Sequence, residues 1–341
     1  MNSVRSVLSR GMLAFLLMIP ACIFAQTAGQ ALSIPYELNP FAAATVFAQN
    51  PGQAPFPPLS PEHQKFLDDV LQLWEQRSQS IQRYRCTFKR WEYDPVFGPR
   101  DTFKTYSEGV IRYATPDKGM FKVEKMMEYV APAESGGRPQ YQQRDGDHYE
   151  HWICDGQSVF SHDPVNKQQV QMILPPEMRG KAIADGPLPF LFGAEAEKIK
   201  QRYWIRPLPM PPDVKGEYWL EAYPKRREDA ASYQKVHVII DHADFLPKGL
   251  VIFDRNFDPV RNPARSTFTF EQREANWSIA LQQLKFWERE FYEPKVPAGW
   301  KRIVENYDSP TGTEQSAPAS PGGGQRPNSQ ATRPAAGPPT R

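Results

Sequence analysis

The sequence lacks the signatures of most enzymes and of nucleic-acid-binding proteins. It contains no Gly-x-Ser-x-Gly nucleophile turn, no His-Glu-x-x-His zinc motif and no glycine-rich phosphate loop. The formal net charge is only +2, which disfavours nucleic acid or an anionic surface as the main partner. We therefore expect a non-enzymatic protein, without catalytic residues, a bound metal or another cofactor.

Long apolar segments are also scarce, and the one candidate lies near Met1. Arg5 and Arg10 precede an apolar run at residues 11–25, which is too short to cross a bilayer comfortably but is typical of a secretory signal peptide. We predict that residues 1–25 direct export to the periplasm or another part of the cell envelope, with no transmembrane span in the mature chain. Lipid anchoring at Cys22 is disfavoured because Pro20 is unusual in a lipoprotein signal.

Cysteine is rare, with three in the chain, and only Cys86 and Cys154 lie beyond the predicted signal. An envelope compartment permits a disulfide between them. Both lie in predicted strands, and a disulfide requires Cα atoms within about 7 Å. Two buried apolar thiols are the alternative, and the sequence leaves both open.

Composition divides the chain into four parts. Residues 26–59 are rich in Ala, Gln and Pro without a sustained period, which predicts a flexible spacer. Residues 308–341 contain no large apolar residue and are dominated by Pro, Gly, Ser, Ala and Thr, which predicts a disordered tail. Residues 60–307 are numerous enough to build one domain around one core.

Two segments of that domain have helical patterns. Ser60 and Pro61 suit an N-cap and a first helical position, and an apolar stripe at i, i+3, i+4 spacing predicts a helix over 61–83. The second helical region is expected at 187–203. Its start holds consecutive Phe190, Leu191 and Phe192, which on a helix spread over about 300°. One face packed on a sheet cannot bury all three, so we expect the segment to act as a lid.

Alternating apolar and polar residues predict β-strands over most of the remainder. Thirty-five prolines and 12% aromatic residues agree with such a fold. An Asp155-Gly156 turn joins two of the strands, and 131–148 reads as a polar loop. The fold class expected is mainly β (α+β): a large curved antiparallel sheet or half-open β-barrel covered by an N-terminal and a short internal helix. The expected strands are 84–93, 109–113, 121–129, 152–154, 159–160, 168–174, 218–223, 235–241, 249–254, 266–270 and 284–292.

The order of short motifs resembles one family. Asp155-Gly156, Phe160, Asp163-Pro164, Gln169-Val170 and the run 187–191 follow one another as in the LolA/LolB-like outer-membrane lipoprotein carriers. More narrowly, the chain looks like a planctomycete LolA-like envelope family of unknown function. The resemblance implies a half-open barrel with the first helix across its mouth, and carriage of lipidated proteins without catalysis. On the residues alone, ordinary packing of that helix on a sheet is equally compatible.

The candidate ligand site is apolar. A single sheet has one face without a partner sheet, and helices cover it only in part, which leaves a groove for a chain-like ligand. The leading hypothesis is therefore an envelope protein that binds acyl chains, lipids or lipidated proteins. The alternative is a structural or interaction module with a filled core and no ligand. The residues expected to line the cavity are Phe88, Trp91, Ile111, Tyr113, Phe121, Trp152, Phe160, Phe190, Leu191, Trp204 and Trp219.

A polar cluster supports a third hypothesis, a hydrolase. Asp145, Asp147, His148, His151 and Asp155 are residue types that metal sites use. Their spacing matches no established metal motif, and a solvated loop beside a strand edge explains them better. We therefore expect no metal site there.

Overall fold

The computed structural model describes residues 53–131, 138–176, 179, 190–191, 195–276 and 294–306. The predicted signal peptide, most of the predicted spacer, the predicted tail and the predicted strand at 284–292 lie outside these ranges. Within the described residues, no helix is both long and apolar enough to span a membrane.

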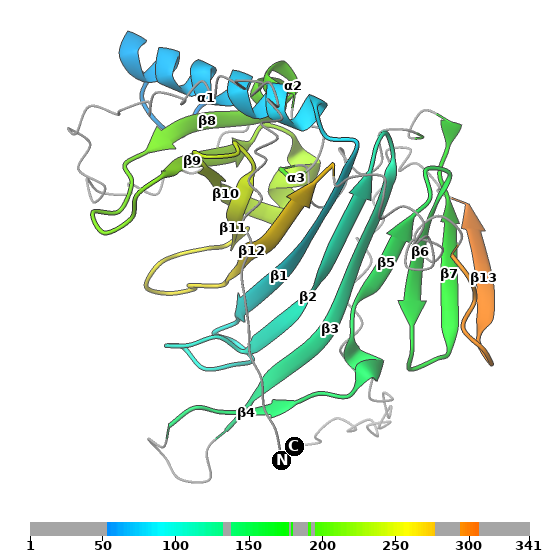
Figure 1. Ribbon diagram of the computed structural model, residues 1–341. Helices are drawn as coiled ribbons and strands as arrows, with labels where there is room; N and C mark the ends of the chain where they lie inside the picture. Colours follow the sequence, from blue (N-terminus) through cyan, green and yellow to red (C-terminus); the bar gives the residue numbers. More distant parts are fainter. Residues whose placement is uncertain are drawn as a thin grey trace, which may run out of the picture.

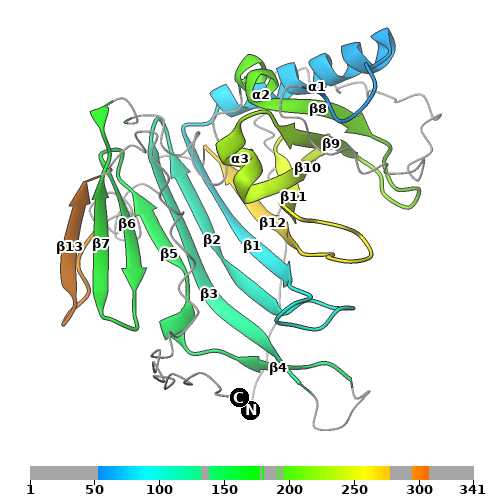
Figure 2. The ribbon, with the colours of Figure 1, turned by 180° about the vertical axis from the view of Figure 1, so that it is seen from behind.

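The described strands form one large, strongly curved sheet that does not close on itself (Figure 1, Figure 2). Its order is β13-β7-β6-β5-β3-β2-β1-β12-β11-β10-β9-β8, and β4 pairs with the end of β3. The strands are β1 (Arg83–Tyr93), β2 (Thr105–Ala114), β3 (Lys118–Val130), β4 (Gln140–Gln143), β5 (His151–Cys154), β6 (Ser158–Asp163), β7 (Gln168–Ile173), β8 (Tyr203–Leu208), β9 (Glu217–Pro224), β10 (Tyr233–Asp241), β11 (Pro247–Asp254), β12 (Arg265–Ala275) and β13 (Lys301–Asn306).

The predicted fold class is confirmed, with a few local corrections. Neighbouring strands pair antiparallel, except that the edge strand β13 lies parallel to β7. Strands β8 and β13 were not predicted, and β4 lies within the predicted loop 131–148. All six residues of β13 are exposed, and β4 is polar, so neither segment carries the alternation that marks a half-buried strand.

The first helix, α1 (Pro61–Gln79), confirms the prediction and ends four residues before its expected limit. Ser60 is the N-cap, and its hydroxyl accepts a hydrogen bond from the backbone N–H of His63 at 3.3 Å. The second helical region is shorter than expected. Phe190 and Leu191 lie in a turn, α2 covers only Ala196–Arg202, and Tyr203 begins β8. The described residues also contain the helices η1 (Gly146–His148) and α3 (Arg227–Ser232).

The main hydrophobic core lies between α1 and one face of the sheet, which we call the inner face. Helix α1 contributes Trp74 and four other buried residues, and it lies across β8 and β9 in both views (Figure 1, Figure 2). The other face, the outer face, carries a smaller cluster that includes Ile153 and Phe160. Between the β-bulges, where the register shifts, period-2 alternation assigns the strand residues to one face or the other.

Cys86 and Cys154 are both buried free thiols, so the disulfide considered from the sequence is not formed. They belong to β1 and β5, and β2 and β3 lie between these strands. Three inter-strand spacings separate the Cα atoms by about 14 Å, which is too far for a disulfide. Burial raises the pKa of Cys86 to about 12 and the pKa of Cys154 to about 11, so both thiols stay protonated at neutral pH.

Candidate functional site: the inner face of the sheet

A glycine allows the central aromatic residues of the inner face to meet. Phe88 on β1 stacks on Phe121 of β3, with ring centres 4.5 Å apart, although β2 runs between them. The β2 residue opposite Phe88 is Gly109. A Cβ at Gly109 would lie 2.0 Å from the carbonyl oxygen of Lys122 and 2.7 Å from a ring carbon of Phe88. The missing side chain therefore leaves the space through which the Phe88 ring reaches Phe121.

The stacked pair belongs to a longer line of aromatic rings. Phe121 stacks on Trp152 of β5 at 5.7 Å, and Phe88 lies 6.2 Å from Phe268 of β12. The line therefore extends over five neighbouring strands, from β12 through β1, β2 and β3 to β5. Phe268, Phe88 and Phe121 are buried, whereas Trp152 is half-buried.

Arg90 is a buried cation among these rings. Its Nη1 donates to Glu150 Oε2 at 2.8 Å, and its Cζ lies 5.8 Å and 5.9 Å from the ring centres of Phe121 and Phe268. Glu92 adds a second carboxylate at 3.6 Å. The guanidinium charge is therefore compensated within the protein, and it holds Glu150, just before β5, against the inner face.

Burial differs between the two halves of the inner face. Over β9 and β10 six inner-face residues are buried: Tyr218, Leu220, Ala222, Val236, Val238 and Ile240. Over β5, β6 and β7 the inner-face residue Cys154 is buried, but four apolar inner-face residues are only half-buried: Trp152, Val159, Val170 and Met172. We call the first set the covered half and the second set the open patch.

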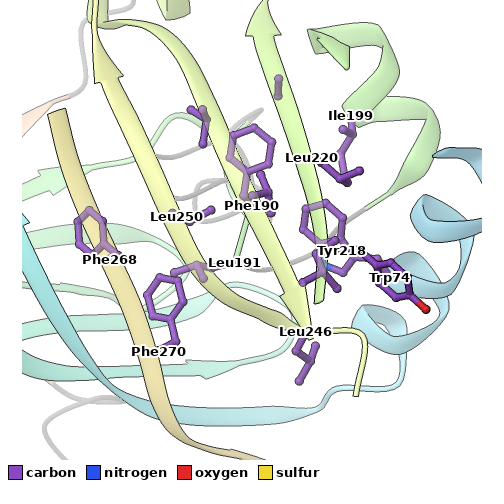
Figure 3. Close-up of a cluster of buried hydrophobic side chains, with 14 of the residues drawn as sticks. Trp74, Phe190, Leu191, Ile199, Tyr218, Leu220, Leu246, Leu250, Phe268 and Phe270 are labelled. Atoms are coloured by element: carbon purple, nitrogen blue, oxygen red, sulfur yellow. The ribbon is translucent and has the colours of Figure 1, made fainter. Parts of the chain in front are cut away.

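The covered half lies beneath α1 and the turn that holds Phe190 and Leu191. The Phe190 ring lies 4.8 Å from Tyr203 and 6.5 Å from Trp74. Phe190 and Leu191 are only 3% and 5% exposed. Figure 3 shows both side chains over the sheet, among residues of β9, β11 and β12. In this conformation the two predicted lid residues pack as part of the core.

The eleven residues predicted to line one cavity divide between the two faces. Phe88, Ile111, Tyr113, Phe121, Trp152, Phe190 and Leu191 belong to or pack against the inner-face core. Trp91, Phe160, Trp204 and Trp219 belong to the outer face, so they cannot line an inner-face site. The sequence prediction grouped residues by type. Strand parity separates them, because residues three apart in a strand, such as Phe88 and Trp91, point to opposite faces.

Sequence reasoning also missed part of the inner-face surface. Val159, Val170 and Met172 were not among the predicted site residues, although the alternation of Val170 and Met172 in the 168–174 segment gave their common face. Arg90 was missed as well. Arg90 is two residues beyond Phe88, so it continues the alternation of Tyr84, Cys86 and Phe88. This alternation could have placed Arg90 on the inner face.

The outer face holds a buried ionic cluster centred on Glu221 of β9. Its carboxylate accepts from Lys235 Nζ at 2.7 Å and from Arg206 Nε at 2.7 Å, and it lies 3.1 Å from His237 Nε2. Burial alone would raise the pKa of Glu221, but the His237 hydrogen bond and the charges of Lys235 and Arg206 outweigh it and hold that pKa well below its usual range. The buried carboxylate is therefore compensated by its cationic neighbours, and the cluster has the character of a structural ion network.

A second outer-face cluster joins β5, β6, β7 and β13. His151 and His162 stack with ring centres 4.2 Å apart. His162 Nε2 lies 3.2 Å from Gln169 Nε2, and Gln169 Oε1 accepts two hydrogen bonds from Arg302. Gln169 lies on the face opposite the apolar Val170 and Met172, yet it is fully buried. Burial, followed by the charges of His162 and Lys122, lowers the pKa of His151 to about 3.

Among the described side chains of the predicted polar cluster at 145–155, His151 and Asp155 make separate contacts. His151 stacks in the outer-face cluster, whereas Asp155 Oδ1 accepts hydrogen bonds from the backbone N–H groups of Gln157 and Ser158 in the hairpin turn. Across the described part of the chain, no three His, Cys, Asp or Glu side chains are arranged to hold a metal ion. The metal-dependent hydrolase hypothesis therefore gains no support from these residues.

No family profile matches the sequence, and no curated protein matches it. Among solved structures, an uncharacterised conserved protein from Thermus thermophilus is similar with a TM-score of 0.37 and 8% identity, covering 70% of this chain and 98% of the other. A putative outer membrane lipoprotein-sorting protein domain from Vibrio parahaemolyticus is similar with a TM-score of 0.31 and 13% identity, covering 66% of this chain and 98% of the other. A LolA superfamily protein from Nitrosomonas europaea is similar with a TM-score of 0.29 and 11% identity, covering 63% of this chain and 96% of the other. At these scores the similarities assign neither a family nor a function.

Proposed function

We propose that this protein is a non-enzymatic protein of the cell envelope that holds an acyl chain, a lipid or the lipid-modified part of a protein against the inner face of its sheet. The observation that carries the proposal is the fall in burial along that face. Trp152, Val159, Val170 and Met172 form an apolar surface that α1 and the sheet itself leave half-buried. An apolar chain lying there removes this surface from water, at about 25 cal/mol per Å².

The aromatic line indicates how such a ligand lies. Trp152 is the half-buried end of the line, and Phe121 and Phe88 continue it into the core. A flexible chain entering at Trp152 contacts flat apolar surface along its length and needs few polar partners. Arg90 is already paired with Glu150, so we assign it to holding the wall of the site and not to binding a charged head group.

The proposal is tested with a fatty acid that carries bromine on its acyl chain, because bromine quenches tryptophan fluorescence on contact. We expect saturable quenching whose amplitude falls strongly in Trp152→Phe. Trp91→Phe is the matched control, since Trp91 is also half-buried but lies on the outer face against Tyr106. Equal loss of quenching in the two variants, or no saturable quenching in the unchanged protein, would contradict an inner-face ligand.

A ligand-free structural or interaction module is the second candidate, and one observation favours it. Phe190 and Leu191 are buried against Trp74 and the sheet in the manner of core residues. If the core is closed permanently, the protein binds no acyl probe, and truncation of either residue costs the full penalty of a close-packed site, about 3–5 kcal/mol for Phe.

The envelope location rests on the predicted signal peptide at residues 1–25. N-terminal sequencing of protein from the envelope fraction is expected to begin near Gln26. An intact Met1 in that fraction would remove the basis for export by this signal.

A further inference from the structure

The edge strand β13 has one paired and one open side. It pairs in parallel with β7, and the N–H of Lys301 donates to the carbonyl oxygen of Lys167 at 2.9 Å. Because backbone groups alternate along a strand, those of Ile303 and Glu305 also point towards β7, and those of Arg302 and Val304 point outwards. All six residues of β13 are exposed, Ile303 by 36% and Val304 by 57%. Within the described ranges no strand pairs with this outer side.

Such an edge accepts another strand, and the sequence of β13 suits a second copy of itself. In a two-fold dimer the axis is normal to the sheet, the two strands are antiparallel, and opposite residues belong to the same face. Residues of the same face oppose each other only when the two-fold axis passes beside one residue, which then faces its own copy. The central residues of β13 that can take this position are Ile303 and Val304. Centring on Val304 places Ile303 opposite a charged Glu305. Centring on Ile303 places Lys301 opposite Glu305 twice and Ile303 opposite Ile303.

We propose that two copies of this chain associate through β13, antiparallel and centred on Ile303. Charge complementarity selects the register, because opposite charges directly across from each other stabilise a strand pair and like charges destabilise it. The backbone groups agree: Arg302 and Val304, whose N–H and C=O point outwards, lie opposite each other and exchange hydrogen bonds. The inference does not depend on ligand binding.

The outer-face contacts hold β13 in place for this pairing. Arg302 donates to Gln169 from two nitrogens at 2.9 Å and 2.7 Å, and its Cζ lies 5.3 Å from the ring centre of Phe160. Trp300 packs edge-on against His162. These contacts all lie on the outer face, so Lys301, Ile303 and Glu305 stay available on the inner face. Pairing then places the open patches of two copies on one continuous inner face.

Cysteine cross-linking of the full chain tests the register. In the proposed pairing the two Ile303 Cα atoms face each other across the axis as a non-hydrogen-bonded pair at about 4.5 Å, a separation that a disulfide spans. Ile303→Cys is expected to form a covalent dimer under mild oxidation. Val165→Cys is the control, because Val165 is 65% exposed in the β6–β7 turn and lies off the edge. Equal dimer yields from the two variants would overturn the proposal.

Charge reversal gives an independent test by sedimentation. Lys301→Glu and Glu305→Lys each place like charges together twice, and each is expected to weaken dimerisation about tenfold or more. When the two variants are mixed, the two substituted positions face each other with opposite charges, and the native Lys301 of one copy faces the native Glu305 of the other. The mixture is therefore expected to recover a heterodimer of wild-type strength. A monomeric wild type, or a mixture no stronger than its components, would overturn the proposal.

Discussion

The covered half and the open patch are two parts of one inner face, built from the same kind of residue. The inner-face side chains of the covered half are buried, whereas over β5 to β7 Trp152, Val170 and Met172 keep part of their surface exposed. The strands pair in the same antiparallel manner in both halves. The difference therefore lies in what covers the sheet and not in the sheet itself. The close-packed core therefore lies beneath the helix, and the half-exposed apolar surface lies away from it.

Gly109 lies on β2, in the middle of the sheet between the covered half and the open patch. Its substitution should have the largest effect on stability. In Gly109→Ala the new Cβ overlaps the Lys122 carbonyl oxygen and the Phe88 ring, so β2 or the aromatic line must shift. We expect a loss of more than about 3 kcal/mol in the free energy of unfolding, measured by urea denaturation. Gly146→Ala is the control, since its Cβ meets nothing closer than 4.0 Å. A nearly neutral Gly109→Ala would show that the stack does not need this gap.

Phe270 and Phe190 allow the stability cost of truncating a residue in the sheet to be compared with that of a residue in the turn that covers the sheet. Phe270 is buried on β12, and Phe270→Ala is expected to cost about 3–5 kcal/mol. Phe190 is equally buried. If its segment is the lid predicted from the sequence, Phe190→Ala should cost clearly less and should weaken binding of an acyl probe. Equal penalties in chemical denaturation, with no probe bound by wild type, would favour the ligand-free module.

Acid should weaken the open end of the sheet through His151. Its pKa is about 3 in the folded protein and near 6.5 when unfolded, so between these values the unfolded chain binds more protons. Stability contributed by neutral His151 is therefore present above pH 6.5 and lost as the pH falls, by on the order of 2 kcal/mol near pH 4.5. In His151→Gln the slope of unfolding free energy against pH in this window should flatten. An unchanged slope would assign the acid sensitivity to other groups.

The smallest effect is expected from the predicted tail. Deleting 308–341 removes residues with no large apolar side chain, so the free energy of unfolding should change by less than about 0.5 kcal/mol. A clear fall in melting temperature would show that the tail docks on the folded domain.

Local signals predicted the parts of the fold that depend on a few neighbouring residues. Gly156 adopts a φ of +91° in the turn that Asp155-Gly156 predicted, and Ser60 caps α1 as expected. Strand β8 alternates between buried and half-buried residues and pairs with the next strand, β9, but the helical region predicted to reach residue 203 overlapped its start. Strand β13 escaped prediction because its placement depends on a distant partner. β13 is held by β7, more than 120 residues earlier in the chain, and its own residues are all exposed.

The sequence predicted which types of residue form the candidate site, but it did not predict on which face of the sheet each residue lies. Aromatic content indicated an apolar surface, yet Trp91, Phe160, Trp204 and Trp219 belong to the other side of the sheet. Gln169 illustrates the opposite error. A glutamine in an alternating strand reads as solvated, but Arg302 and the carbonyl of Lys295 satisfy its amide and bury it. Such partners come from the end of the domain and leave no local signal.

Native mass spectrometry of the protein purified from its own envelope tests the central claim most directly. We predict a co-purified lipid or acyl species that is released on denaturation, retained in Val165→Lys at the β6–β7 turn and lost in Val170→Lys within the open patch. A ligand-free mass for the wild-type protein, or retention of the same species by Val170→Lys, would contradict the assignment of the open patch as a binding surface.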